Sequence, residues 1–189
     1  MKKIFLTTIL FIMICKTAYS TVLFEPGVGF AVGRFDQLGT DVGGDFKGLY
    51  LSGRLCHNFD SGVFAGIDFR TYSLLTTTSG DPNYNTSLLN TSRGFTLGFT
   101  PIDRLRFWFS YQFINSFIMP ESTTSDVELS DGKAFIAGIG YMGIKWISVN
   151  IEYATYYFDK AKDGSDHIQL TNDYSIRTFM ISFSFPMDF

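Results

Sequence analysis

Residues 105–113 read LRFWFSYQF, and this stretch decides the fold. One set of alternate positions is aromatic or aliphatic: Leu105, Phe107, Phe109, Tyr111 and Phe113. The positions between them hold Arg106, Trp108, Ser110 and Gln112. Successive side chains of a β-strand point to opposite faces of the sheet, so a period of two predicts a strand with one apolar face and one more polar face.

The same alternation returns in seven other runs: residues 22–34, 47–56, 62–72, 92–99, 133–142, 146–158 and 174–189. Most of the eight runs are long. Strands that cross a membrane at a tilt need ~9–11 residues, whereas strands of soluble sheets typically have ~5–6. The run lengths therefore favour membrane-crossing strands.

The predicted connections alternate in length. Four are long and polar: residues 35–46, 73–91, 117–132 and 159–173. Three are short: residues 57–61, 100–104 and 143–145. This pattern places both chain ends on the side of the short turns, and it is typical of outer-membrane barrels, whose long loops face outward and whose short turns face the periplasm.

Side-chain size differs between the two faces of the runs. One face carries Phe, Leu, Ile, Val and Tyr, and the other carries mainly Gly, Ala, Ser and Thr with a few charges. Eight strands enclose room only for packed side chains, so we expect the small residues inside. The predicted fold is all-β, an eight-stranded antiparallel up-and-down transmembrane β-barrel. The alternative, a soluble barrel with its apolar face inward, requires a charged outer face that these runs lack.

The first twenty residues predict a secretory signal peptide. Lys2 and Lys3 precede an apolar stretch over residues 4–15, and residues 18–20 (AYS) have the small residues of a cleavage site. The chain is then expected to divide into a signal peptide, 1–20, and an outer-membrane β-barrel domain, 21–189. We expect export through the cleaved peptide to the cell outer membrane.

Charge and cysteine content exclude other classes. Acidic residues outnumber basic ones by 18 to 15, and the predicted signal peptide takes three lysines with it. An acidic chain repels phosphate backbones, so no nucleic-acid partner is expected. Only Cys56 follows residue 20, so the exported chain has no cysteine partner for an internal disulfide.

The C-terminal residues carry a family resemblance. After Ile181, apolar residues stand at every second position and the chain ends on phenylalanine: Phe183, Phe185, Met187 and Phe189. This pattern resembles the C-terminal strand of small Gram-negative outer-membrane barrels of the OmpA, OmpX and OmpW types. The resemblance implies recognition by the barrel assembly machinery. Pro186 departs from the pattern, because proline cannot donate to the ladder and is confined to edge or terminal positions.

Six charged residues have inward parity: Glu25, Arg54, Asp68, Arg70, Arg106 and Glu152. Buried charges are costly unless they are paired, and both signs are present, so we predict a lumen charge network in which Glu25 and Arg54 can pair. Such a network can form a gated polar path or a salt-bridged plug. The plug is favoured because the lumen of eight strands is narrow.

Catalysis and metal binding have little support. His57 and His167 are predicted at opposite ends of the barrel, and a triad of His167 with Asp166 and Ser165 would need three adjacent residues to converge. The acidic segment 159–173 lacks the ligand spacing of a calcium loop. We therefore expect no enzyme, no catalytic residues, no metal and no cofactor.

Aromatic residues near strand ends are predicted at the membrane interfaces: Tyr72, Tyr111, Tyr141, Trp146, Tyr156, Tyr157 and Tyr174. The expected function is a structural or surface-interaction role through long extracellular loops. A conduit for small apolar molecules is the alternative, and an outer-membrane lipid-modifying enzyme is a third hypothesis. Expected partners are outer-membrane lipids and lipopolysaccharide, the assembly machinery and an unidentified extracellular partner, with the chain itself a monomer.

Overall fold

The computed structural model describes residues 21–39, 43–78, 85–119, 127–144, 146–163 and 166–189. The predicted signal peptide, 1–20, lies outside these residues. Their strands are β1 (Thr21–Gln37), β2 (Gly43–Asn58), β3 (Val63–Thr78), β4 (Asn85–Ile102), β5 (Leu105–Met119), β6 (Val127–Ser130), β7 (Lys133–Ile144), β8 (Ile147–Asp163), β9 (Asp166–Ser184) and β10 (Met187–Asp188). No helix among the described residues is both long and apolar enough to span a membrane.

The ten labelled strands occupy eight positions around one ring. Strands β6 and β7 both lie between β5 and β8, separated only by Asp131, whose φ is +55°, and Gly132. Strands β9 and β10 both pair with β1 and are separated by Phe185 and Pro186. All pairings are antiparallel between neighbours, which confirms the predicted eight-stranded up-and-down barrel.

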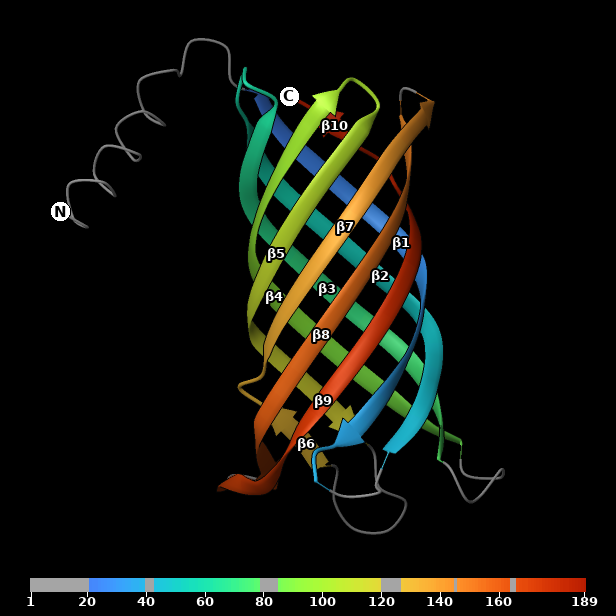
Figure 1. Ribbon diagram of the computed structural model, residues 1–189, viewed down its shortest axis with the longest axis vertical. Helices are drawn as coiled ribbons and strands as arrows, with labels where there is room; N and C mark the ends of the chain where they lie inside the picture. Colours follow the sequence, from blue (N-terminus) through green and yellow to red (C-terminus); the bar gives the residue numbers. More distant parts are fainter. Residues whose placement is uncertain (1–20, 40–42, 79–84, 120–126, 145, 164–165) are drawn as a thin grey trace, which may run out of the picture.

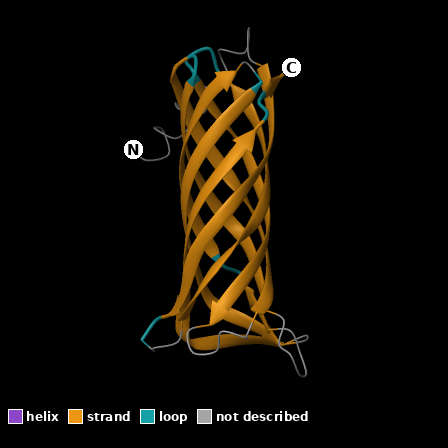
Figure 2. Cartoon of the chain, turned by 90° about the vertical axis from the view of Figure 1, so that its right-hand side faces the viewer, coloured by secondary structure: helices purple, strands orange, loops and turns teal. Residues whose placement is uncertain are grey.

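Pairing of the first and last long strands closes the ring. Residues 27–37 of β1 pair with residues 174–184 of β9, and β1 pairs with β2 on its other side. From Glu25 on β1, the paired residue on β2, then its partner on β3, and so on around the ring leads back to β1 at Phe35 and not at Glu25. The pairing is therefore displaced toward the loop end of β1 after one full turn. This stagger tilts the strands relative to the barrel axis, as Figures 1 and 2 show.

Both ends of the described chain lie at the end of the barrel that carries the tight turns, as predicted (Figure 1). The turn between β2 and β3 requires Gly62, whose φ is +77°, a conformation that glycine adopts without a Cβ clash. Its N–H donates to the Phe59 carbonyl at 2.9 Å. We call this the turn end and the opposite end the loop end.

The predicted long loops at the loop end are wrong over most of their length. Strand β3 runs to Thr78 and β4 begins at Asn85, while β8 runs to Asp163 and β9 begins at Asp166. Between strands at this end lie only residues 38–42, 79–84, 120–126 and 164–165. The alternation does continue along the described strand ends, and its polarity is reversed at Phe46, which points inward while its neighbours Asp45 and Lys47 are exposed.

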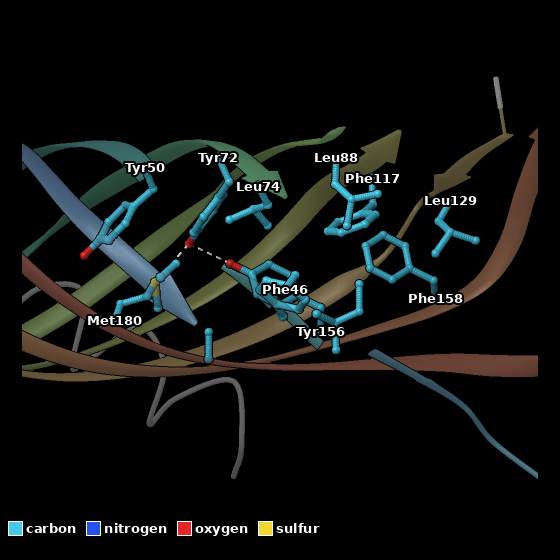
Figure 3. Packing of buried hydrophobic residues seen from close by; sticks show 14 of the residues in the cluster. Phe46, Tyr50, Tyr72, Leu74, Leu88, Phe117, Leu129, Tyr156, Phe158 and Met180 are labelled. Atoms are coloured by element: carbon cyan, nitrogen blue, oxygen red, sulfur yellow. Dashed lines mark hydrogen bonds between the residues drawn. The ribbon is translucent and has the colours of Figure 1, made fainter. Parts of the chain in front are cut away.

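The reversed alternation builds an apolar core inside the loop-end half of the barrel. Figure 3 shows this cluster, in which Tyr72 and Tyr156 meet and the Tyr156 hydroxyl donates to the Tyr72 hydroxyl at 2.8 Å. Its largest members are Phe46, Tyr50, Tyr72, Leu74, Leu88, Phe117, Leu129, Tyr156, Phe158, Ile176 and Met180. The prediction that Tyr72 and Tyr156 lie at a membrane interface is therefore wrong, since both are buried inside, and Tyr174 packs against the same cluster.

The outer wall carries a continuous apolar belt. Large apolar side chains point outward from every long strand and are exposed, for example Leu49, Phe95, Phe109, Ile151 and Phe183. Inward neighbours such as Ser110 and Ser182 are buried. The in-and-out assignment made from the sequence therefore holds for these strands.

The C-terminal strand breaks at the proline. After Ser184 the ladder is interrupted, but the Phe185 N–H donates to the Pro26 carbonyl at 2.9 Å and β10 resumes pairing with β1. Phe189 and Val22 exchange two backbone hydrogen bonds of 2.9 and 3.1 Å. The interruption at Pro186 is local, and the segment stays on the ring.

Gly132 provides a test of the packed loop-end core. A Cβ at this position would overlap the Phe158 ring, whose atoms are its three nearest neighbours. We expect Gly132→Ala to lower the free energy of unfolding by ~1–3 kcal/mol, the usual cost of overpacking. The second change Phe158→Leu should recover part of that loss. Urea unfolding in detergent micelles measures both, and additive losses would contradict this packing.

Candidate functional site

The structure brings all six inward charges predicted from the sequence into the lumen. They come from five strands, and none is more than 4% exposed: Glu25, Arg54, Asp68, Arg70, Arg106 and Glu152. Three carboxylates and three guanidinium groups balance one another. Burial of ions in a protein interior is tolerated where each charge meets an opposite charge and hydrogen-bonding partners.

Arg70 is the centre of one half of the network. Its guanidinium donates to Asp68 through Nε and Nη2, each at 2.9 Å, on its own strand β3. It also donates across the lumen to Glu152 on β8, through Nη1 at 3.0 Å and Nη2 at 2.7 Å. Two-pronged contacts of this kind fix both distance and orientation, so Arg70 ties opposite walls of the barrel together.

Glu25 is the centre of the other half, nearer the turn end. Arg106 of β5 donates to both of its carboxylate oxygens, at 3.0 and 2.5 Å. Arg54 of β2 approaches it at 3.6 Å, and the Ser184 hydroxyl donates at 2.5 Å. The structure thus contains the Glu25–Arg54 pair that the sequence suggested, but Arg106 is the closer partner.

Trp108 joins the two halves and Tyr50 extends the half around Arg70, and sequence reasoning did not include either residue in the network. The Trp108 indole N–H donates to Glu152 at 2.9 Å, and the Arg54 guanidinium lies over the indole ring, 3.9 Å from its centroid. The Tyr50 hydroxyl donates to Glu152 at 2.8 Å. Both residues have inward parity in the sequence, which is the signal that could have identified them.

The network fills the cross-section of the barrel. Trp108 sits against Gly138, where any Cβ would overlap the indole ring, and the Ser110 hydroxyl is within 2.9 Å of both Asp68 and Thr96. Toward the loop end the apolar cluster continues the packing. A void there, lined by Tyr72, Asn90 and Tyr156 among others, measures about 10 Å³, which is close to the smallest space that holds one water.

The network is not completely satisfied within the protein. Arg54 Nη1 and Arg106 Nε are buried and have no hydrogen-bond partner among the described atoms. Both belong to the half around Glu25. Two arginines therefore share one carboxylate there, and this half is the less tightly held part of the lumen.

The wall beside the network is continuous. Over the described residues, every long strand pairs antiparallel with the strand on each side of it. A conduit with a lateral exit would need a gap between neighbouring strands. The described part of the wall has none.

The remaining predicted residues do not assemble into a second site. His57 lies at the turn end of β2, where its ring contacts Phe59 edge-on at 4.7 Å. Ser165 lies outside the described residues, and Asp166 and His167 begin β9 at the loop end. Among the described residues, no group of three His, Cys, Asp or Glu side chains could hold a metal ion.

The C-terminal residues of the predicted assembly signal lie on the outer wall. Phe183, Phe185 and Phe189 are exposed, and Met187 is partly buried in β10. Their outward direction places them in the apolar belt. The role in assembly stays a prediction.

The sequence matches no protein-family model and no curated protein sequence. The structure is similar to that of Ail, the attachment invasion locus protein of Yersinia pestis, in complex with a heparin analogue: TM-score 0.57 and 13% identity over 88% of this chain and 99% of that one. It is also similar to the Neisserial surface protein NspA, with TM-score 0.56 and 11% identity over 86% and 96%. A third similar structure is OprG from Pseudomonas aeruginosa, with TM-score 0.54 and 12% identity over 89% and 97%. The chain therefore has the fold of small outer-membrane β-barrels.

The coupling between Arg70 and Glu152 is testable. Arg70→Met leaves two buried carboxylates without their cation, so it should lower the free energy of unfolding by ~3–5 kcal/mol. Glu152→Gln added to Arg70→Met should cost less than the sum of the two single changes, by ~0.5–3 kcal/mol. Urea titrations of all four proteins in micelles measure the difference. Additivity within ~0.5 kcal/mol would mean that the pair is not coupled.

Proposed function

We propose that this chain is a monomeric barrel of the Gram-negative outer membrane with a closed lumen, and that its role is structural or one of surface interaction at the loop end. The observation that carries the proposal is the six-charge network, buried and paired across the whole lumen. A barrel closed in this way offers solutes no path, which leaves its two ends and its outer wall to act.

The apolar belt supports a place in a bilayer. Exposed aromatic and aliphatic side chains cover the outer wall of every long strand, and a water-soluble protein rarely exposes a continuous apolar surface of that extent. In lipid every backbone donor and acceptor must be paired inside the protein, and the closed ring meets that requirement.

The loop end supports a surface role. There the strands continue beyond the apolar belt and their inner faces turn apolar. Their outer faces carry exposed polar residues such as Asp45, Thr91 and Asp159 beside apolar ones such as Leu89, a more polar mixture than that of the belt. The projecting part is packed inside by the apolar cluster and forms a platform that carries the segments between strands. The role expected through long extracellular loops becomes a role through this platform and the connections on it.

The proposal includes the partners expected from the sequence. The outward phenylalanines of the C-terminal segment would be recognised by the barrel assembly machinery during insertion. Lipids and lipopolysaccharide would surround the belt, and an extracellular partner would meet the loop end. The unbroken wall does not favour the conduit, and the described residues offer no catalytic cluster that would favour an enzyme.

Lipid contact predicts a depth-dependent cost of charge on the outer wall. Phe183 and Leu75 are both outward and similarly exposed, at 52% and 56%, but Phe183 lies within the belt and Leu75 lies opposite Lys47 beyond it. We expect Phe183→Lys to lower the free energy of unfolding in bilayers by ~2–4 kcal/mol and Leu75→Lys by ~0–1 kcal/mol. Equal costs for the two changes would contradict a bilayer around the belt.

The closed lumen predicts that the protein conducts no ions across a planar bilayer. Protein that has folded, as judged by a mobility difference between boiled and unboiled samples on a detergent gel, should show no discrete conductance steps. The variant Arg70→Ala/Glu152→Ala/Trp108→Ala, checked by the same gel, should conduct because it removes the centre of the plug. Regular conductance steps from the unchanged protein would overturn the closed-lumen proposal and favour transport.

A further inference from the structure

A groove crosses the outer wall where the apolar belt ends toward the loop end. It has a volume of about 980 Å³ and is lined by residues of β8, β9, β1, β2 and β3. Three of its lining residues are cations, Arg34, Lys47 and Arg177. Its apolar lining residues include Val32, Leu75, Tyr153 and Phe179, all of which are 41–56% exposed.

One carboxylate holds the two arginines in place. Asp36 accepts from Arg34 Nε at 2.7 Å through one oxygen and from Arg177 Nη2 at 2.6 Å through the other. These hydrogen bonds, first that of Arg34 and then that of Arg177, lower the pKa of the Asp36 carboxyl, so it stays ionised. Both arginine side chains remain 56% exposed, which leaves guanidinium N–H groups available on the outside of the groove.

The strand register concentrates positive charge at this height. Arg34 lies directly opposite Arg177 in the pairing of β1 with β9, an arrangement of like charges that is unfavourable without a counter-ion. One step nearer the belt, Val32 lies between Lys47 on one side and Phe179 on the other. Asp45 lies opposite Arg34. Three cations against two carboxylates leave a net positive charge.

We propose that this groove binds a phosphorylated lipid of the outer leaflet, with the phosphate on Arg34, Arg177 and Lys47 and the acyl chains against Val32, Tyr153 and Phe179. The inference deepens the proposed function and rests on it, because the groove meets lipid headgroups only if the belt lies in a bilayer.

The chemistry of the groove matches the two parts of such a lipid. Guanidinium groups bind phosphate oxygens through paired N–H donors, and lysine adds a flexible point charge. Asp36 is the one carboxylate that accepts hydrogen bonds from both Arg34 and Arg177. A phosphate bound between the two arginines would add a second negative charge beside them. Val32 and Phe179 continue directly into the belt, so chains attached to that phosphate would lie along the wall as they do in the bilayer.

The test is native mass spectrometry of the folded protein in detergent micelles with bis-phosphorylated lipid A as the probe. We expect the triple variant Arg34→Gln/Lys47→Gln/Arg177→Gln to bind this lipid at least tenfold more weakly than the unchanged protein. The matched control Arg93→Gln/Lys133→Gln/Lys160→Gln removes the same charge from outside the groove and should bind within twofold of the unchanged protein. Dephosphorylated lipid A should bind the unchanged protein as weakly as the triple variant binds the probe.

The outcomes separate this inference from the proposed function. A mobility shift on a detergent gel shows that the unchanged protein, the triple variant and the control variant have all folded. If all three then bind the lipid equally, or if the unchanged protein binds dephosphorylated lipid A as well as the probe, the lipid site in the groove is overturned and the proposed function is not. Displacement of the lipid by a tenfold excess of inorganic phosphate overturns the lipid as occupant. A protein that folds and stays soluble without detergent overturns the membrane barrel itself.

Discussion

Closure of the backbone ladder is the constraint on which the rest of the structure depends. A sheet with an apolar outer face has to pair all of its backbone groups within the protein, and only a ring leaves no edge. Strand β1 meets both β2 and β9 over most of its length, and the C-terminal segment continues that pairing past Pro186 to Phe189. Once the ring is closed, the inside is narrow and every inward side chain competes for the same space.

The lumen is filled in two ways. Oppositely charged side chains pair in one zone, and apolar side chains pack together in the other. Around Arg70 and Glu152 the inward residues are ions and their hydrogen-bonding partners, with the Trp108 ring filling the space that Gly138 leaves. Toward the loop end, rings such as that of Tyr156 replace the ions. Both zones are filled with side chains, but only the first holds opposite walls together by ion pairs. On the proposal of a closed interior, interactions with other molecules take place at the outer wall and the loop end.

The sequence was sufficient for the fold and for the membership of the charged network, because a period of two fixes which residues share a face. Glu25 and Arg106 are far apart in the sequence, so their parity predicts that both are inside but not that they touch. That contact depends on the stagger of the ring, which one-dimensional alternation does not contain. The Glu25–Arg54 pair was easier to foresee because the two residues lie opposite each other on adjacent strands.

The loop end was mispredicted for a related reason. Phe46 points inward between the exposed residues Asp45 and Lys47, which is the opposite polarity to that of the belt. The inward residues Leu74 and Leu88 stand in polar sequence and each precedes an exposed leucine, so these segments look like loops when only an apolar outer face is sought. The structure explains the reversal physically: where the barrel leaves the belt, water replaces the apolar surroundings and the apolar side chains turn inward. A search for period two of either polarity would have extended the strands. Tyr72 and Tyr156 already had inward parity within the predicted runs 62–72 and 146–158, and that parity alone would have placed both in the interior.

The most direct test of whether the apolar belt lies in a bilayer is to measure, along one strand, whether the outer wall is surrounded by lipid or by water. Single cysteines at positions 177, 179, 181 and 183 of β9, in a chain with Cys56→Ser, would carry nitroxide labels in lipid vesicles. The account predicts that oxygen, which concentrates in lipid, relaxes the labels at 179, 181 and 183, and that a water-soluble nickel chelate relaxes the label at 177. Access of the nickel chelate to all four positions would contradict the bilayer-embedded belt and would make the apolar wall the surface of a different assembly.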